Sequence, residues 1–244
     1  MRTFPWAHIL FVRPRKAKSF GNLAAMRHEI LFQPEFAVAR IMLEPGESIR
    51  AESGAMMSMS PSINLESKVA GGLGKMFGRM LTGESAFQTT FTATNGPGEV
   101  LLAPGLPGDI AVVDVSARPL IVTSGAYLAG DTRLEIQTQA SLKGFFGGEG
   151  LFMMRIAGPG MLMLATYGAM RAVELQPGQG YIVDTGHLVA FSEGMGYNLR
   201  KATRSLLGSV TSGEGIVAEM TGPGIVYTQT RTISALIAMM PARG

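Results

Sequence analysis

Residues Gly148–Gly168, GEGLFMMRIAGPGMLMLATYG, decide the fold class of this chain. Two apolar stretches of strand length flank a Gly-Pro-Gly corner, and a Gly-Glu-Gly entry precedes them. Versions of this pattern occur at Gly83–Gly98 (GESAFQTTFTATNGPG) and Gly213–Gly224 (GEGIVAEMTGPG). The Gly-Glu pair recurs at a spacing of 65 residues both times, which indicates a repeated structural unit.

A second piece alternates with the first along the chain. Leu43–Gly54 (LEPGESIRAESG) aligns without a gap with Leu175–Gly186 (LQPGQGYIVDTG), and the Pro-Gly pair in each predicts a type II turn. A third version, RPLIVTSGAYLA, carries the same Ser-Gly end at Gly125 but lacks the Pro-Gly turn. Because both pieces keep one order in all copies, we predict three repeats of about 65 residues. These repeats cover residues 36–104, 105–168 and 169–231.

The composition favours an all-β domain. Hydrophobic residues make up 46% of the chain and charged residues 16%, and the 32 Gly and 13 Pro are typical of short strands with tight turns. No helical patterns of 10–15 residues separate the strands, which argues against a parallel α/β fold. We therefore predict one all-β domain over residues 29–244, a double-stranded β-helix or barrel-like sandwich with a pseudo-threefold repeat. A short helix at 232–240 would end it.

The positive net charge belongs to the N-terminal leader. Residues 1–25 contain five of the 21 basic residues and no acidic residue, so the remaining 16 basic and 18 acidic residues give a net charge of −2. We therefore expect no nucleic-acid partner. Residues 1–28 are interpreted as a disordered tail, or as a start assigned ahead of Met26, although the basic leader has some transit-peptide character. No run of eighteen apolar residues is present.

The quoted runs, together with GGLGKMFGRMLTGESAF and KGFFGGEGLFMMRIAGPG, resemble the altered inheritance of mitochondria protein 24 family over about residues 30–240. The resemblance implies a double-stranded β-helix similar to that of the tryptophan RNA-binding attenuation protein, and it implies association of subunits. The fungal mitochondrial member is linked to inner-membrane organisation and respiratory-complex integrity, whereas the prokaryotic members have no agreed activity. The resemblance implies no catalytic residues.

The residues themselves give little support to an enzyme. The chain has no Cys, and its three His residues are far apart in sequence, which disfavours thiolate chemistry and a multi-histidine metal site. Cupin metal enzymes place His-x-His on the strand after a Pro-Gly turn, but Ile49–Glu52 and Ile182–Asp184 contain no His. Gly71–Lys75 lacks the Ser or Thr of a phosphate-binding loop, since Met76 follows. We predict no catalytic residue, cofactor or metal.

The repeated acids Glu84, Glu149 and Glu214 allow two interpretations. In the favoured one, each carboxylate accepts hydrogen bonds from the amides of its turn. In the other, the three form a ring that binds a cation. The second interpretation supports an alternative function as a binder of a small molecule or ion, or an enzyme, with a pocket lined by these glutamates.

Three loops that mix glycine, basic and large apolar residues are the predicted interaction surface. Their candidate contact residues are Lys68, Lys75, Phe77, Arg79, Lys143, Phe145, Phe146, Arg200, Lys201 and Arg204. Such loops suit subunit contacts or an anionic membrane surface. The leading prediction is a non-enzymatic scaffold or interaction protein that forms a homo-oligomer, with a trimer favoured. It would contact a protein or membrane partner in the cytoplasm or at the membrane periphery, or in the mitochondrion of a eukaryotic source.

Overall fold

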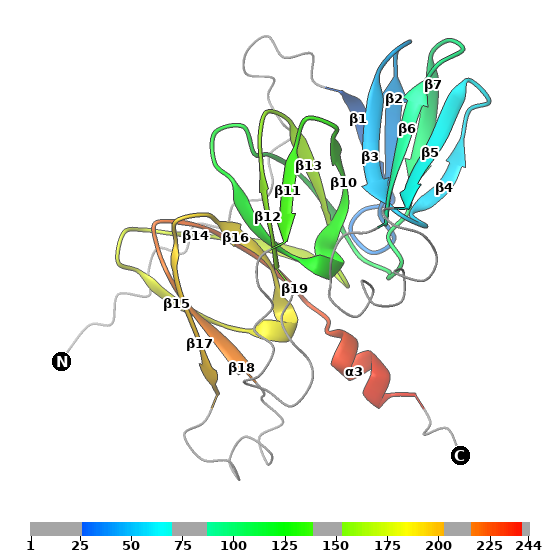
Figure 1. Cartoon of the computed structure of the whole chain (residues 1–244). Helices are drawn as coiled ribbons and strands as arrows, with labels where there is room; N and C mark the ends of the chain where they lie inside the picture. The colour runs from blue at the N-terminus through cyan, green and yellow to red at the C-terminus, as the bar shows by residue number, and fades with distance from the viewer. Residues whose placement is uncertain (1–25, 70–86, 139–152, 203–215, 241–244) are drawn as a thin grey trace, which may run out of the picture.

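A computed structural model describes residues 26–69, 87–138, 153–202 and 216–240 of the chain. In these residues, nineteen strands form four antiparallel sheets, and one short α-helix follows the last strand (Figure 1). The predicted all-β class is confirmed. The sheets stack as sandwiches and do not close into a barrel, because each sheet in the described part of the chain ends in two edge strands.

The strands after β1 fall into three consecutive sets of six, which we call units 1, 2 and 3. β1 spans Arg27–Leu31 and pairs with β2, so the fold begins at the last two residues of the predicted leader. Unit 1 comprises β2 (Val38–Leu43), β3 (Ser48–Glu52), β4 (Met56–Met59), β5 (Ile63–Val69), β6 (Phe87–Ala93) and β7 (Gly98–Leu102).

Units 2 and 3 contain the remaining strands. Unit 2 comprises β8 (Ile110–Asp114), β9 (Leu120–Thr123), β10 (Tyr127–Asp131), β11 (Glu135–Thr138), β12 (Met153–Ala157) and β13 (Met161–Ala165). Unit 3 comprises β14 (Met170–Leu175), β15 (Gly180–Asp184), β16 (Leu188–Ser192), β17 (Gly196–Lys201), β18 (Ile216–Thr221) and β19 (Gly224–Gln229). Short 3-10 turns precede β10 (η1, Ser124–Ala126) and β16 (η2, Thr185–His187).

Each unit distributes its strands between two sheets in the same way. The first, third and sixth strands lie in one sheet, and the second, fourth and fifth lie in the next. The sheet orders are β1-β2-β7-β4, β5-β6-β3-β10-β13-β8, β11-β12-β9-β16-β19-β14 and β15-β18-β17. The two six-stranded sheets therefore contain three strands from each of two neighbouring units. This sharing joins the units through backbone hydrogen bonds.

The Gly-Pro-Gly segments turn the chain from one sheet to the next. β12 pairs with β9 and β11, whereas β13 pairs with β8 and β10, so the strands on either side of Gly158–Gly160 are not hydrogen-bonded to each other. The segment is a corner of the sandwich and not the turn of a hairpin. Gly158 and Gly160 both have positive φ, at 114° and 151°, which a residue with a side chain rarely adopts.

The two predicted Pro-Gly turns are confirmed. Gly46 and Gly178 occupy positive φ, at 87° and 74°. The amides of Glu47 and Gln179 donate to the carbonyls of Glu44 and Gln176, at 2.9 Å in each case, which closes the four-residue turns. Both turns lead from the first to the second strand of a unit, and therefore also from one sheet to the other.

The core consists of three clusters of inward-facing residues, one dominated by each unit. Phe91 and Leu102 belong to the cluster of unit 1, Val122 and Ile156 to that of unit 2, and Phe191 to that of unit 3. Along β2 and β3 the buried positions largely alternate with more exposed ones, as strands of a two-layer sandwich require.

The predicted C-terminal helix is confirmed as α3, Ile233–Ala238. Thr232 caps it, because its hydroxyl oxygen accepts a hydrogen bond from the amide of Ala235 at 3.2 Å. Figure 1 shows α3 beyond the last strand, set apart from the sheets.

Candidate functional site

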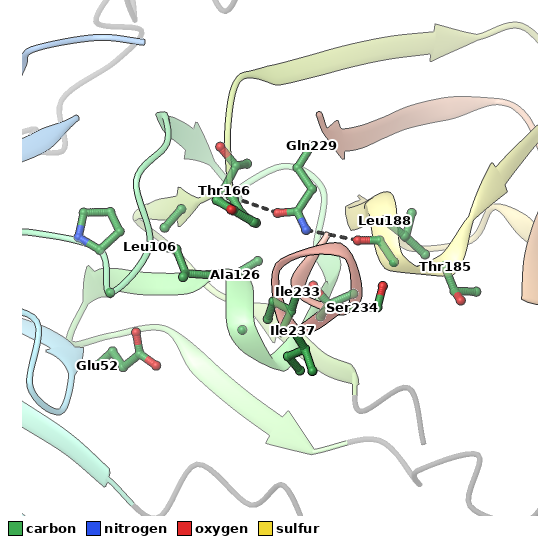
Figure 2. A pocket seen from close by; sticks show the side chains of 17 residues that line it. Glu52, Leu106, Ala126, Thr166, Thr185, Leu188, Gln229, Ile233, Ser234 and Ile237 are labelled. Atoms are coloured by element: carbon green, nitrogen blue, oxygen red, sulfur yellow. Dashed lines mark hydrogen bonds between the residues drawn. The ribbon is translucent and has the colours of Figure 1, made fainter. Parts of the chain in front are cut away.

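A pocket of about 580 Å³ lies where the three units approach one another beside α3 (Figure 2). Its lining consists of strand ends, unit connections and one face of the helix. The lining residues are Glu52, Pro104, Gly105, Leu106, Thr123, Gly125, Ala126, Ala165, Thr166, Tyr167, Thr185, Gly186, Leu188, Gln229, Ile233, Ser234 and Ile237. More than one hundred residues of sequence separate its first and last contributors.

The recurring Ser/Thr-Gly ends bring corresponding parts of the three units to this pocket. Glu52 ends β3 in unit 1, Gly125 lies in η1 of unit 2, and Gly186 lies in η2 of unit 3. All three lie at or just after the end of the second strand of their unit, where the chain returns to the neighbouring sheet. The aligned sequence pieces therefore predicted a shared structural position, although nothing in them predicted a pocket.

Glu52 supplies the carboxyl group among the described lining residues. Its side chain lies across the pocket from Ile233 and Ile237 of α3 (Figure 2). Burial raises the pKa of the Glu52 carboxyl above its ordinary value, because desolvation disfavours the charged form. A carboxylate beside Leu106, Ala126 and the two isoleucines suits an apolar ligand that carries one hydrogen-bond donor or positive charge.

Gln229 connects units 2 and 3 at the wall of the pocket. Its side-chain amide donates to the carbonyl of Gly186 at 3.1 Å, and its side-chain oxygen accepts from the amide of Tyr167 at 2.9 Å (Figure 2). The backbone carbonyl of Gln229 lies 2.7 Å from Nδ1 of His187. These bonds hold η2 against the end of β19. They also give His187 a structural role.

Thr166 joins the connection between units 2 and 3, in which it lies, to the connection between units 1 and 2. Its buried hydroxyl lies 2.7 Å from the carbonyl of Gly168 and 3.2 Å from both the amide and the carbonyl of Asp109. Gly108 forms a parallel bridge with Gly168, and a Cβ atom at Gly108 would come within 1.8 Å of the Thr166 carbonyl oxygen. The close approach therefore requires glycine at position 108.

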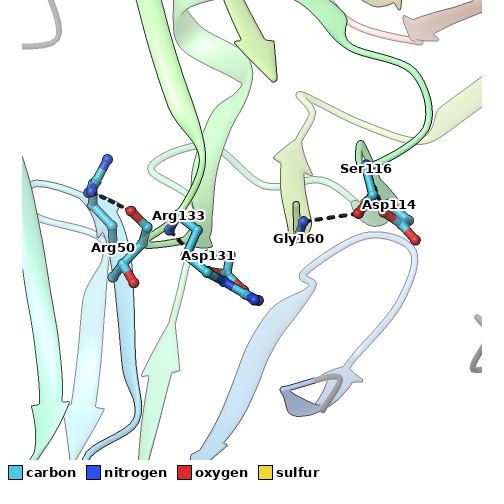
Figure 3. Close-up of polar contacts among 7 residues, drawn as sticks. Arg50, Asp114, Ser116, Asp131, Arg133 and Gly160 are labelled. Atoms are coloured by element: carbon cyan, nitrogen blue, oxygen red, sulfur yellow. Dashed lines mark hydrogen bonds and ion pairs between the residues drawn. The ribbon is translucent and has the colours of Figure 1, made fainter. Parts of the chain in front are cut away.

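Polar groups also fasten the pairing of units 1 and 2. Tyr127 donates its hydroxyl to the carbonyl of Arg50 at 3.0 Å, and Arg50 donates to the carbonyl of Thr132 at 2.8 Å. Beside them, Arg133 holds Asp131 in an ion pair (Figure 3). Burial alone would raise the pKa of Asp131, but the hydrogen bonds and charge of Arg133 outweigh it and lower the pKa.

A second polar contact fastens the Gly-Pro-Gly corner of unit 2. The hydroxyl of Ser116 accepts from the amide of Gly160 at 3.1 Å, and the carboxylate of Asp114 accepts from the amide of Ser116 at 2.8 Å (Figure 3). Both bonds lie next to the pairing of β8 with β13. Asp114 and Ser116 therefore help to hold the corner in place, although no sequence motif predicted this role.

Exposed apolar side chains gather at particular elements of the described surface. Three belong to β4 (Met56, Met57 and Met59), one to β15 (Ile182), and four to α3 and its C-terminal end (Ile233, Ile237, Met239 and Met240). Within the described residues, β4 and β15 are edge strands whose outer sides have no paired strand. Clustered apolar surface of this kind marks contacts with other molecules.

Most of the sequence-predicted interaction residues lie outside the described residues. This applies to Lys75, Phe77, Arg79, Lys143, Phe145, Phe146 and Arg204, and to the repeated acids Glu84, Glu149 and Glu214. Lys68 lies in β5, and Lys201 is exposed at the end of β17. Arg200 forms an ion pair with Glu219 of the adjacent β18 at 2.5 Å, so part of its charge is matched within the sheet.

Thr166 and Gln229 could not be predicted from the sequence, because no motif accompanies either residue. Their importance comes from bonds to residues far away in sequence.

Among the described residues, no group of three or more His, Cys, Asp or Glu side chains is placed to hold a metal ion. In the same residues, no helix has the length and apolar character needed to cross a membrane.

Comparison with known proteins places the chain among relatives of unassigned activity. An uncharacterised protein of Streptococcus pyogenes serotype M6 is 31% identical over 215 residues, which cover 84% of this chain and 86% of the relative. The crystal structure of another Streptococcus pyogenes protein matches with a TM-score of 0.74 and 29% identity, over 87% of this chain and 97% of that one.

The match to a family model is equally extensive. The model described as Mitochondrial biogenesis AIM24 matches residues 28–231, which include β2–β19 of all three units. The match confirms the family resemblance inferred from the sequence. The chain belongs to the Mitochondrial biogenesis AIM24 family.

Proposed function

We propose that this protein is a self-associating scaffold without catalytic activity, which contacts protein or membrane partners. The exposed apolar side chains on β4 and α3, together with Ile182 on β15, carry the proposal. Burial of such apolar surface is favourable, and edge strands with free backbone groups are common sites of association. By the composition of their sequence, the three predicted Gly/basic/apolar segments would add to the contact surface.

The chemistry of the pocket supports a non-catalytic role. Acid–base and nucleophilic mechanisms need at least two groups held in register, such as a nucleophile and its base. The described lining residues offer the Glu52 carboxyl and the Tyr167 phenol as titratable groups. Tyr167 is bonded through its backbone amide to Gln229, within the junction of units 2 and 3.

Light scattering coupled to size-exclusion chromatography tests the proposal. The full chain is expected to elute at a multiple of its monomer mass at micromolar concentration, with a trimer or larger ring favoured. Flotation with vesicles of phosphatidylcholine, with and without phosphatidylserine, tests the membrane contact, which should require the anionic lipid. A chain that stays monomeric and ignores both kinds of vesicle would refute the scaffold proposal.

The pocket favours a second candidate function, the binding of a small molecule. Its volume of about 580 Å³ falls within the range of roughly 300–1,000 Å³ that is usual for ligand sites. The apolar walls and the Glu52 carboxyl favour an alkyl chain that ends in an amine. Glu52 would take the place that the sequence-based alternative gave to the repeated glutamates.

Thermal unfolding in the presence of decylamine, decanol and decanoate tests this second function. The amine should raise the melting temperature most and the carboxylate least, because Glu52 attracts the first and repels the last. Gly125 lines the pocket, and a Cβ atom there would meet no atom within 4 Å, so Gly125→Phe is expected to reduce the pocket volume, with Gly125→Ala as the matched control. If Gly125→Phe keeps the full response to decylamine, the ligand binds elsewhere.

A further inference from the structure

Neighbouring units are joined by two strand pairs that share one register. β3 of unit 1 pairs antiparallel with β10 of unit 2, and β9 of unit 2 pairs in the same way with β16 of unit 3. The facing residues are Ala51–Ala129, Arg50–Gly130 and Ile49–Asp131 in the first joint, and Val122–Ala190, Ile121–Phe191 and Leu120–Ser192 in the second. Aligned on the Ser-Gly ends of β3 and β9, these are the same three positions.

A recurring irregularity fixes the alignment of the other strand. The register shifts between Tyr127 and Ala129 where β10 pairs with β13, and between Leu188 and Ala190 where β16 pairs with β19. The same shift occurs between Met56 and Ser58, where β4 pairs with β7. β4 is therefore the unit 1 equivalent of β10 and β16. By the alignment of their Ser/Thr-Gly ends, β15 is the unit 3 equivalent of β3 and β9.

β4 and β15 are the two strands of this set that have no joint partner in the described chain. β4 ends the first sheet and β15 ends the last sheet. Figure 1 shows them at opposite ends of the row of strands, with unit 2 between them. Their outer backbone groups are those that form hydrogen bonds between chain segments in both observed joints.

Side chains on β4 and β15 are also more exposed than their equivalents in the two joints. Met57 of β4 is 59% exposed, whereas the equivalent residues Leu128 and Val189 are buried in the core. Ile182 of β15 is 56% exposed, whereas the equivalent Ile121 is buried. Neither β4 (MMSM) nor β15 (GYIVD) contains the Lys or Pro that commonly protects an exposed edge strand from pairing.

We infer that β15 of one chain pairs with β4 of a second copy, in the register of the two internal joints. The facing residues are then Val183–Ser58, Ile182–Met59 and Tyr181–Ser60, which places two exposed apolar side chains opposite each other. The pairing makes one sheet of order β17-β18-β15-β4-β7-β2-β1 from two chains. Because the two surfaces differ, the contact is head-to-tail and generates a ring when the rotation closes. The inference rests on the self-association proposed above.

Disulfide cross-linking tests the register directly, because the natural sequence contains no Cys. One chain carries Ile182→Cys and the other carries Met59→Cys, and the two are mixed and oxidised. Facing Cα atoms of antiparallel strands are about 4.5–5.5 Å apart, within disulfide range, whereas diagonal positions are about 7–8 Å apart. We expect a cross-linked dimer from this mixture, and far less from Ile182→Cys mixed with Met57→Cys.

Charge substitution tests whether the pair supports assembly. Ile182→Lys and Met59→Lys should each weaken self-association by about tenfold or more, as measured by the concentration dependence of mass in light scattering. Leu65→Lys is the matched control, since Leu65 is also exposed and also lies on an edge strand, β5, which has no part in the inferred contact. It should leave the mass unchanged.

The outcomes separate this inference from the proposed function. A wild-type chain that is monomeric refutes both. A wild-type oligomer that survives Ile182→Lys and Met59→Lys, and gives no register-specific cross-link, keeps self-association but overturns the β15–β4 contact. If a Lys variant fails to fold, the cross-linking result alone decides, because the Cys substitutions replace exposed side chains on otherwise unchanged strands.

Discussion

Truncation of Phe191 should destabilise the whole chain strongly. Phe191 lies in β16, faces Ile121 across the joint of units 2 and 3, and is 2% exposed. Its ring packs in the core of unit 3, with its centroid 5.1 Å from that of Tyr197. Phe191→Ala removes a buried aromatic ring and leaves a cavity, which costs about 3–5 kcal/mol in comparable cores.

That cost is large compared with the total stability of a domain, about 5–15 kcal/mol. For a chain of this length, each kcal/mol lowers the melting temperature by about 2–4 °C, so the expected fall is about 6–20 °C. Because the units share sheets, we expect one cooperative transition with a lower midpoint and not the separate melting of unit 3.

Circular dichroism measures both quantities, the free energy of unfolding in a urea titration and the melting temperature in a thermal scan. All variants are compared at one protein concentration, because association affects apparent stability. Phe36→Ala is the control, since the same substitution is made at a side chain that is 70% exposed. It should change the free energy of unfolding by about 0.5 kcal/mol or less. The argument fails if the two variants unfold at the same urea concentration, or if Phe191→Ala gives two separate transitions.

Three further predictions concern polar groups. Thr166→Val removes the hydrogen bonds of a buried hydroxyl to the backbone of Asp109 and Gly168, so it should lower the free energy of unfolding by about 0.5–1.5 kcal/mol in urea titrations. The same substitution at the exposed Thr221 should have no measurable effect, and equal effects would contradict the assigned bonds. Burial raises the pKa of the Tyr127 phenol, so spectroscopic titration should show it still protonated when the exposed tyrosines have ionised. If Tyr127 ionises together with the exposed tyrosines, its burial is disproved. Burial also raises the pKa of the Glu52 carboxyl, so the stability that its protonated form confers is lost as the pH rises from the ordinary carboxyl pKa through the raised one. Glu52→Gln should therefore have a higher melting temperature than wild type near about pH 7 but not near about pH 3. A difference in melting temperature that is the same at both pH values would count against the pKa shift.

Local sequence signals predicted the local structure well. Pro45-Gly46 predicted a turn with positive φ at the glycine, and Gly46 has it. Thr232 at the start of an apolar, spaced segment predicted a capped helix, and its hydroxyl caps α3. Such features depend on a few neighbouring residues, since φ preferences and caps act within one turn. For the same reason the repeated markers were visible without any structure.

The sequence did not predict which strands pair with each other. Alternation along a strand shows which side faces the core, but not which strand lies beside it. Gly158–Gly160 therefore suggested two strands joined at a corner, and only the structure showed that these strands belong to different sheets. Hydrogen bonds between distant segments decide this pairing, and their free energy depends on how the whole set of strands packs.

The pocket shows the same division. The sequence by itself determined the all-β class, the spacing of the units, the family and the positions of the turns. Only the tertiary structure brought Glu52, Gly125 and Ile237 to one cavity, and only it left β4 and β15 as edge strands without the partner that their equivalents have. The physical reason is that turn residues act through the backbone within a few positions. A pocket or an open edge instead arises where chain segments far apart in sequence meet or fail to meet.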